Sequence, residues 1–280
     1  MEEMINGKAI YSPKGAALEY GRVGCNFYTG CPRNCDYCYL KRGAPSKQLG
    51  GTEVKLKKCF KDENDALEVF CGEVRKHIDY LRKVGIFFSF TTDPLIPETI
   101  DLTLSAINMC IYNDVSVRVL TKDDEFVEYE RFKLNLSSEQ FKKYVSIGFT
   151  LTGCDYMESN APSNMARIRA MHTLKNNGIK TFASIEPVID WESSKMIVRI
   201  ALLYCDHFKI GLRSGVKEDY YDDSELIDSV IWLKHLILDT GKTVYFKESL
   251  RKRISKIEDY GWLMDFLKDT SDMDGNIIKY

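Results

Sequence analysis

Three cysteines lie within eight residues of the chain, with CxxxCxxC spacing, at Cys31, Cys35 and Cys38. A short, turn-rich loop of this kind can aim three thiolates at one point. Thiolates are soft ligands that favour iron–sulfur clusters, zinc and Cu(I) over hard cations. Three sulfurs are one fewer than the four that usually hold a [4Fe–4S] cluster, so one iron of such a cluster would be open to another ligand.

Zinc is the main alternative for this loop. Cys35 and Cys38 can form half of a zinc site, and Cys25 and Cys31 can complete a four-cysteine set. Structural zinc sites, however, usually pair one short Cys or Cys/His hook with a second at a distance, and the chain has no second CxxC and no HxxxH motif. The spacing favours a three-cysteine cluster. A non-catalytic binding protein stabilised by zinc or by an Fe–S centre stays open as the alternative class.

Composition limits the other possibilities. With 280 residues, 44% of them hydrophobic, the chain can form one large domain or two small ones. Its formal net charge of −2 gives no overall positive charge that would attract nucleic acid. No apolar stretch approaches the roughly 20 residues of a membrane span, and the first residues lack the layout of a signal peptide. Nine cysteines without an export signal indicate a reducing compartment, so we expect a cytoplasmic protein without membrane association.

The elements that must position the cysteines alternate between strand-like and helix-like segments, which predicts parallel βαβ units. About six units fit before residue 215, fewer than the eight of a closed TIM barrel. We therefore predict an α/β fold: a partial parallel (β/α)6 TIM-type barrel over residues 1–215, with a short helical extension over 216–280 packed on it. Strands are expected at 22–28, 86–90, 116–120, 145–150, 179–187, 207–212 and 243–246, and helices at 62–84, 98–112, 137–144, 164–177, 192–204 and 224–240.

The cysteine loop follows the first of these strands, at the end of the barrel where such folds carry their chemistry. The segment from Asn26 to Tyr39, NFYTGCPRNCDYCY, resembles the cluster loop of radical S-adenosylmethionine (radical SAM) enzymes. More narrowly, it resembles the branch that contains spore photoproduct lyase and DNA repair photolyase-like proteins. The similarity extends over roughly residues 20–215, and the fold that it implies, a partial (β/α)6 barrel, agrees with the number of segments.

The resemblance implies a mechanism. A [4Fe–4S] cluster on Cys31, Cys35 and Cys38 would chelate the amino and carboxylate groups of S-adenosyl-L-methionine through its open iron. An electron from a donor such as flavodoxin or ferredoxin would then cleave the cofactor to a 5′-deoxyadenosyl radical, which abstracts a hydrogen atom from the substrate. The cofactors carry out the radical chemistry, and the protein orients the cofactors and the substrate in a cavity poor in water.

The resemblance also places cofactor contacts at the ends of successive strands. Tyr37 and Tyr39 flank Cys38 where aromatic residues line the adenine, and the second strand ends near the cofactor's amino group. Threonine hydroxyls at the end of the fourth strand can bind the ribose. The implied cofactor-binding residues are Tyr37, Tyr39, Thr92, Asp93, Lys122, Thr150, Thr152 and Glu186.

One departure concerns the substrate. In the lyase pattern, a cysteine just before the Thr/Ser-Asp of the second strand donates hydrogen to the product radical, and here Phe90 occupies that position. The lyase also has a longer segment before its cluster. Direct repair of the spore photoproduct is therefore not indicated, and the catalytic residues are unknown. Cys154 is a weaker candidate hydrogen donor from another direction.

The substrate class stays open at this stage. We expect a lyase or transferase-like radical SAM enzyme with a nucleic-acid substrate, or alternatively a peptide or small-metabolite substrate. A basic run near the C-terminus can grip a phosphate backbone, although such runs are more often solvated helix faces. This run comprises Lys247, Arg251, Lys252, Arg253 and Lys256.

Overall fold

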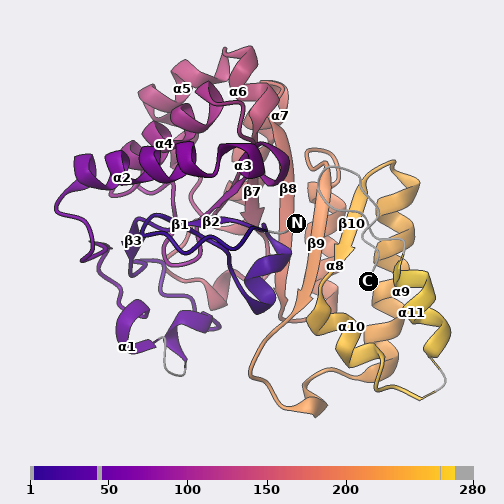
Figure 1. Cartoon of the computed structure of the whole chain (residues 1–280). Coiled ribbons are helices and arrows are strands. Elements are labelled where there is room, and N and C mark those ends of the chain that lie inside the picture. The colour runs from indigo at the N-terminus through magenta and orange to yellow at the C-terminus, as the bar shows by residue number, and fades with distance from the viewer. Residues whose placement is uncertain (1–2, 43–45, 259, 269–280) are drawn as a thin grey trace.

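A curved sheet of eight strands organises the computed structural model (Figure 1), which describes residues 3–42, 46–258 and 260–268. The strand order is β1-β2-β5-β6-β7-β8-β9-β10. All neighbouring pairs from β2 to β10 are parallel, and β1 is antiparallel to β2. The strands are β1 Ile10–Tyr11, β2 Gly24–Cys25, β5 Ile86–Phe88, β6 Val117–Thr121, β7 Val145–Thr150, β8 Lys180–Val188, β9 His207–Leu212 and β10 Thr243–Phe246.

The helices follow the strands in the order expected for βα units. Figure 1 shows α2 to α7 grouped along one part of the sheet and α8 to α11 along the other. None of the helices in the described residues is both long and apolar enough to cross a bilayer. The helices are α1 Ser46–Leu49, α2 Glu63–Lys76, α3 Ile78–Val84, α4 Ile100–Tyr112, α5 Glu130–Leu136, α6 Glu139–Tyr144, α7 Asn164–Asn176, α8 Trp191–Ala201, α9 Asp223–Asp239, α10 Glu248–Ile254 and α11 Gly261–Lys268.

The predicted α/β class with a mostly parallel sheet is confirmed, although no pairing between β1 and β10 closes a barrel within the described residues. The sheet continues past residue 215, because β10 pairs in parallel with β9. The division of the chain at residue 215 stays a prediction, and residues 269–280 of the predicted extension lie outside the described residues.

Three local predictions were wrong. The strand expected at 22–28 leaves the sheet after Cys25, because the side chain of Asn26 accepts a hydrogen bond from the backbone N–H of Phe90 at 2.8 Å. Strand β3 (Tyr28–Thr29) then pairs with β4 (Lys55–Leu56) in a separate two-stranded sheet.

The helix expected at 62–84 is two helices, α2 and α3, divided at His77, whose φ of −113° and ψ of 19° are not helical. Helix α5 lies in a segment with no predicted helix.

The core forms where the helices cover the sheet. Aromatic rings from β5, α2 and the chain after β2 meet there, since the ring centroid of Phe27 is 5.6 Å from that of Phe70 and 6.3 Å from that of Phe88. All three side chains are buried, and burying a phenylalanine side chain stabilises a fold by about 1.5–3 kcal/mol. This core supports the first strands from the outside, so their carboxyl ends can form a rigid rim.

Candidate functional site

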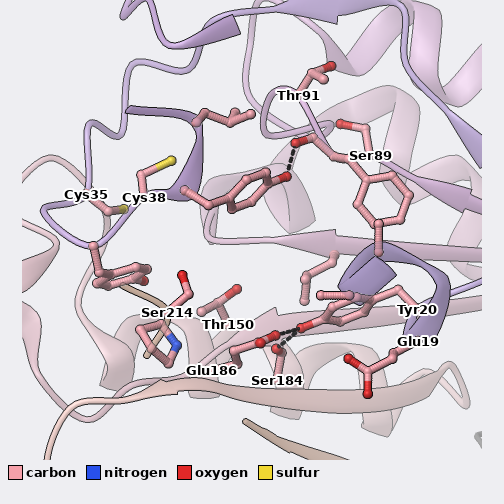
Figure 2. A pocket seen from close by; sticks show the side chains of 18 of the residues that line it. Glu19, Tyr20, Cys35, Cys38, Ser89, Thr91, Thr150, Ser184, Glu186 and Ser214 are labelled. Carbon is pink, nitrogen blue, oxygen red and sulfur yellow. Dashed lines mark hydrogen bonds between the residues drawn. The ribbon is translucent and has the colours of Figure 1, made fainter. Parts of the chain in front are cut away.

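A cavity of about 770 Å³ lies at the carboxyl ends of the parallel strands. Residues at or just after the ends of β5, β6, β7, β8, β9 and β10 line it, together with the cysteine loop and the segment before β2. Figure 2 shows Cys35 and Cys38 on one side of this cavity and Ser184, Glu186, Tyr20 and Glu19 on the other. The predicted site residues that line it are Cys31, Cys35, Cys38, Tyr37, Tyr39, Thr92, Asp93, Lys122, Thr150 and Glu186.

Backbone contacts hold the cysteine loop against the barrel. The N–H of Cys31 donates to the carbonyl oxygen of Gly51 at 2.9 Å, and the N–H of Asp36 donates to that of Met157 at 3.0 Å. Gly30, just before the first cysteine, has φ +81°, and a Cβ there would lie 2.1 Å from the carbonyl oxygen of Glu53. Only glycine fits this approach, because it alone adopts positive φ without a side-chain clash.

Arg33, inside the loop, connects it to two strand ends. Its guanidinium pairs with the carboxylate of Asp123 after β6, and its Nε lies 4.0 Å from Asp93 Oδ2 after β5. Burial and the charge of Asp93 raise the pKa of Asp123 to about 6, against the opposing effect of Arg33. Arg33 therefore keeps two neighbouring carboxylates together beside the cysteines.

The donor set fits a metal centre held by three sulfurs. No group of three or more His, Cys, Asp or Glu side chains in the described ranges is drawn together to hold a metal ion, but the thiols of Cys31, Cys35 and Cys38 all open into one cavity. Burial and the charge of Asp93 raise the pKa of Cys31 to about 11. Cysteine sulfurs are the ligands that hold iron–sulfur clusters, so three cysteines at one cavity fit such a group by their chemistry.

The four-cysteine zinc set is not formed. Cys25 is fully buried in β2, where it pairs with Phe88 of β5, and it does not line the cavity of the other three cysteines. A zinc site on this loop would have to find its fourth ligand elsewhere.

Behind the loop lies a buried polar cluster that joins Tyr37 to the barrel. The Tyr37 hydroxyl donates to Glu158, and Lys122 Nζ lies 3.9 Å from Glu158 Oε1 and 5.5 Å from the centroid of the Tyr37 ring. Arg167 of α7 pairs with Glu158 Oε2 at 2.8 Å and donates to the carbonyl oxygen of Thr150 at 2.8 Å. The side chains of Glu158 and Arg167 are 0% exposed. The cluster thus fixes the predicted residues Tyr37 and Lys122 from behind.

The strand-end residues differ in what they can offer a ligand. Asp93 is already held, since Oδ1 accepts from the hydroxyl of Thr121 at 2.6 Å and Oδ2 from the backbone N–H of Lys122 at 2.8 Å. The hydroxyl oxygen of Thr92 is buried and has no hydrogen-bond partner among the described residues. This oxygen has almost no accessible surface, so although Thr92 lines the cavity, its hydroxyl is not presented to a ligand there.

Two predicted residues lie outside the cavity. Thr152 comes after β7 has ended, and its fully buried hydroxyl donates to Glu158 Oε2 at 3.3 Å, so it does not line the cavity. The thiol of Cys154 donates to Asp190 at 3.1 Å and does not line the cavity either, so its role as a hydrogen donor stays a prediction. Phe90 does line the cavity, with its ring centroid 4.6 Å from that of Phe87.

The basic run near the C-terminus is not a uniform phosphate-binding face. Lys247 is buried at the cavity wall beside Glu186, whereas Lys252 pairs with Glu248 at 2.8 Å on the surface. Arg253 and Lys256 also pair with carboxylates, those of Asp223 and Glu218.

The sequence analysis did not identify the residues that hold the predicted site residues in place. Arg167 carried a readable signal, because it occupies the same helical face as Met171 and Leu174, where an apolar residue is expected. For Glu158, Glu19 and Tyr20 no sequence signal marks a role.

No protein-family model matches the chain. Uncharacterized protein MJ0683 of Methanocaldococcus jannaschii is 30% identical over 197 residues, which cover 67% of this chain and 68% of that protein.

Among solved structures, spore photoproduct lyase complexed with dinucleoside spore photoproduct matches with a TM-score of 0.61 at 16% identity, covering 84% of this chain and 80% of the lyase. Streptococcus suis SuiB bound to S-adenosylmethionine matches with a TM-score of 0.52 at 13% identity, covering 78% of this chain and 48% of SuiB. Both are radical SAM enzymes, so the predicted resemblance is confirmed for the fold. At 30% identity over two thirds of its length, the chain belongs to the same family as MJ0683 and has the fold of radical SAM enzymes.

Proposed function

We propose that this chain is a radical SAM enzyme whose [4Fe–4S] cluster is held by Cys31, Cys35 and Cys38. The observation that carries the proposal is that all three cysteines line the cavity at the ends of the parallel strands. No other cysteine in the described part of the chain lines this cavity. The fit of the fold to spore photoproduct lyase and SuiB supports it.

The chain's own residues orient and enclose the ligands. Three sulfurs leave one iron of a cubane cluster for a chelating group. Tyr37 and Tyr39 place aromatic surface beside the cysteines, and Lys122 places a cation there. When bound, the cluster and S-adenosylmethionine supply one-electron reductive cleavage of a carbon–sulfur bond.

The test is anaerobic reconstitution with iron and sulfide, followed by reduction with dithionite in the presence of S-adenosylmethionine. We expect 5′-deoxyadenosine to form, and we expect its formation to be lost when Cys31, Cys35 or Cys38 is replaced by alanine. Cys59→Ala is the matched control, because Cys59 is an exposed free thiol away from the cavity. A wild-type protein that binds zinc without iron and sulfide, and forms no 5′-deoxyadenosine, contradicts the proposal and favours the binding-protein alternative.

Nucleic acid is the first substrate class to test. The matched lyase structure holds a dinucleoside spore photoproduct, and the partly exposed ring of Phe90 lines the cavity here, where a planar base can stack on it. A nucleic-acid substrate predicts binding that falls steeply with salt. Binding that does not change with salt, or none at all, redirects the search to peptides and small metabolites.

A further inference from the structure

A second polar cluster lines the cavity on the side away from the cysteines. We call it the Lys247 cluster: Glu19, Tyr20, Ser184, Glu186 and Lys247. Glu186 Oε2 accepts from Lys247 Nζ at 2.6 Å and from the hydroxyl of Tyr20 at 2.5 Å, and that hydroxyl is 2.7 Å from Ser184 Oγ. Lys247 Nζ also lies 3.4 Å from Glu19 Oε2. Figure 2 shows Glu186, Ser184, Tyr20 and Glu19 gathered at this wall.

The backbone is shaped around Glu186. The pairing of β8 with β9 shifts register between Ile185 and Val188, so Glu186 and Pro187 form a bulge in β8. Bulges next to active sites re-aim side chains, and proline, which cannot donate to the ladder, is tolerated there. Facing the bulge on β9, a Cβ at Gly211 would lie 2.9 Å from both Glu186 Oε1 and Lys247 Cδ. Glycine at this position leaves room for the carboxylate and the ammonium group to meet.

Burying the ammonium group of Lys247 at this wall costs free energy. Its side chain is 2% exposed, against 23% for Glu186, and burying an ammonium group costs several kcal/mol unless carboxylates compensate it. Two do so, Glu186 on β8 and Glu19 before β2. The surface pairs of the same C-terminal region, such as Lys256 with Glu218, are exposed and need no such arrangement.

The charge of Lys247 has a consequence for Glu186. Within the described residues, both hydrogen bonds that Glu186 receives end on Oε2. The second oxygen, Oε1, is therefore the acceptor left for a donor on a ligand in the cavity. The ammonium group of Lys247 and the hydroxyl of Tyr20 both bind Oε2, and so hold the carboxylate in one orientation.

We propose that Lys247 is a positioning residue, which holds Glu186 aimed into the cavity so that Glu186 accepts a hydrogen bond from an amino or hydroxyl group of the nucleoside part of S-adenosylmethionine. The end of β10 thereby completes the cofactor site. This inference rests on the proposed function, because it takes the cavity to be a site for S-adenosylmethionine.

The experiment measures the dissociation constant of radiolabelled S-adenosylmethionine by equilibrium dialysis against the anaerobically reconstituted protein, together with the thermal midpoint of each variant. We expect Lys247→Met to raise the dissociation constant about tenfold, the size expected for one charge-assisted hydrogen bond. Lys247→Arg, which keeps the charge, should retain most of the affinity. The control is Lys256→Met, which removes an exposed lysine and should bind as the wild type does.

A double-mutant cycle with Glu186→Gln separates positioning from mere structural support. If Lys247 acts through Glu186, the double variant should bind no more weakly than the weaker single variant, since coupled residues are non-additive. A thermal midpoint that falls in Lys247→Met while affinity stays within twofold of wild type overturns the proposal, and so do multiplicative effects in the cycle. Glu186→Gln is nearly isosteric and serves if Lys247→Met does not fold: wild-type affinity in this variant is equally a refutation. A wild type that binds no S-adenosylmethionine refutes the proposed function itself, and this proposal with it.

Discussion

Replacing Glu158 with glutamine tests whether the buried cluster behind the cysteine loop holds that region together. The substitution removes one negative charge and keeps the shape of the side chain. It leaves Arg167 fully buried, with Nη1 donating only to the carbonyl oxygen of Thr150 and to the new amide. We expect the free energy of unfolding to fall by about 3–5 kcal/mol, the usual cost of stranding one partner of a buried ion pair.

The magnitude follows from the geometry. Two unit charges 2.8 Å apart attract by about 6 kcal/mol at an effective dielectric constant of about 20. Part of this attraction is offset because glutamine no longer carries the cost of burying a carboxylate, whereas Arg167 remains buried and charged; the expected loss is therefore about 3–5 kcal/mol. Lys122, whose Nζ lies 3.9 Å from Glu158, loses its nearby carboxylate as well.

Urea unfolding of the metal-free protein, followed by circular dichroism, measures the loss. The double variant Glu158→Met with Arg167→Met removes both charges and should cost much less than Glu158→Gln alone, because a buried pair can often be exchanged for apolar side chains at little cost. Glu192→Gln is the matched control: Glu192 pairs with Lys195 at 2.7 Å but is 78% exposed, so its removal should change stability by at most about 0.5 kcal/mol. A cost under about 1 kcal/mol for Glu158→Gln, or an equal cost for the double variant, would refute this reasoning.

Three further substitutions have defined outcomes. Gly30→Ala places a Cβ 2.1 Å from a carbonyl oxygen, at a residue with φ +81°. We expect the free energy of unfolding to fall by about 1–3 kcal/mol and the protein to bind less iron on reconstitution. An unchanged iron content would contradict the role of this turn. Gly211→Ala should weaken S-adenosylmethionine binding several-fold in equilibrium dialysis, whereas Gly72→Ala, with open space around the new Cβ, should not. Burial and the charge of Lys247 lower the pKa of Lys209 to about 7, while the unfolded chain holds that proton up to about pH 10. The folded state then binds fewer protons between these values, so the free energy of unfolding should rise with pH by up to about 1.4 kcal/mol per unit; Lys209→Met should flatten this slope in urea titrations, and an unchanged slope would assign the dependence to other groups.

The order of strands and helices could be predicted because buried parallel strands read as continuous apolar runs. The bounds expected for the strands at 145–150, 207–212 and 243–246 match β7, β9 and β10. The cysteine loop was equally readable, since three ligands in eight residues form a local pattern. Where a side chain overrides the backbone pattern, prediction fails: Asn26 draws the chain out of the sheet by bonding to the N–H of Phe90.

The supporting residues could not be predicted, because their partners are distant in sequence. Tyr20 meets Glu186 across 166 positions, and Tyr37 meets Glu158 across 121. No periodicity or spacing encodes such pairs, which depend on how the strands are ordered in the sheet. Pro187 was a partial signal, since a proline inside a strand pattern indicates an edge or a bulge, and here it marks the bulge that presents Glu186.

The contacts of β10 bear on the division expected at residue 215. Helix α9 buries Leu226, Val230 and Leu233, and β10 pairs along β9 from Thr243 to Phe246. Without these elements β9 would become an exposed edge, and the carboxylates of Glu19 and Glu186 would face each other across the cavity wall without Lys247. Glu186 would also lose one of the two donors that orient its carboxylate. Residues after 215 therefore contribute to the cavity wall, while the division of the chain at residue 215 stays a prediction.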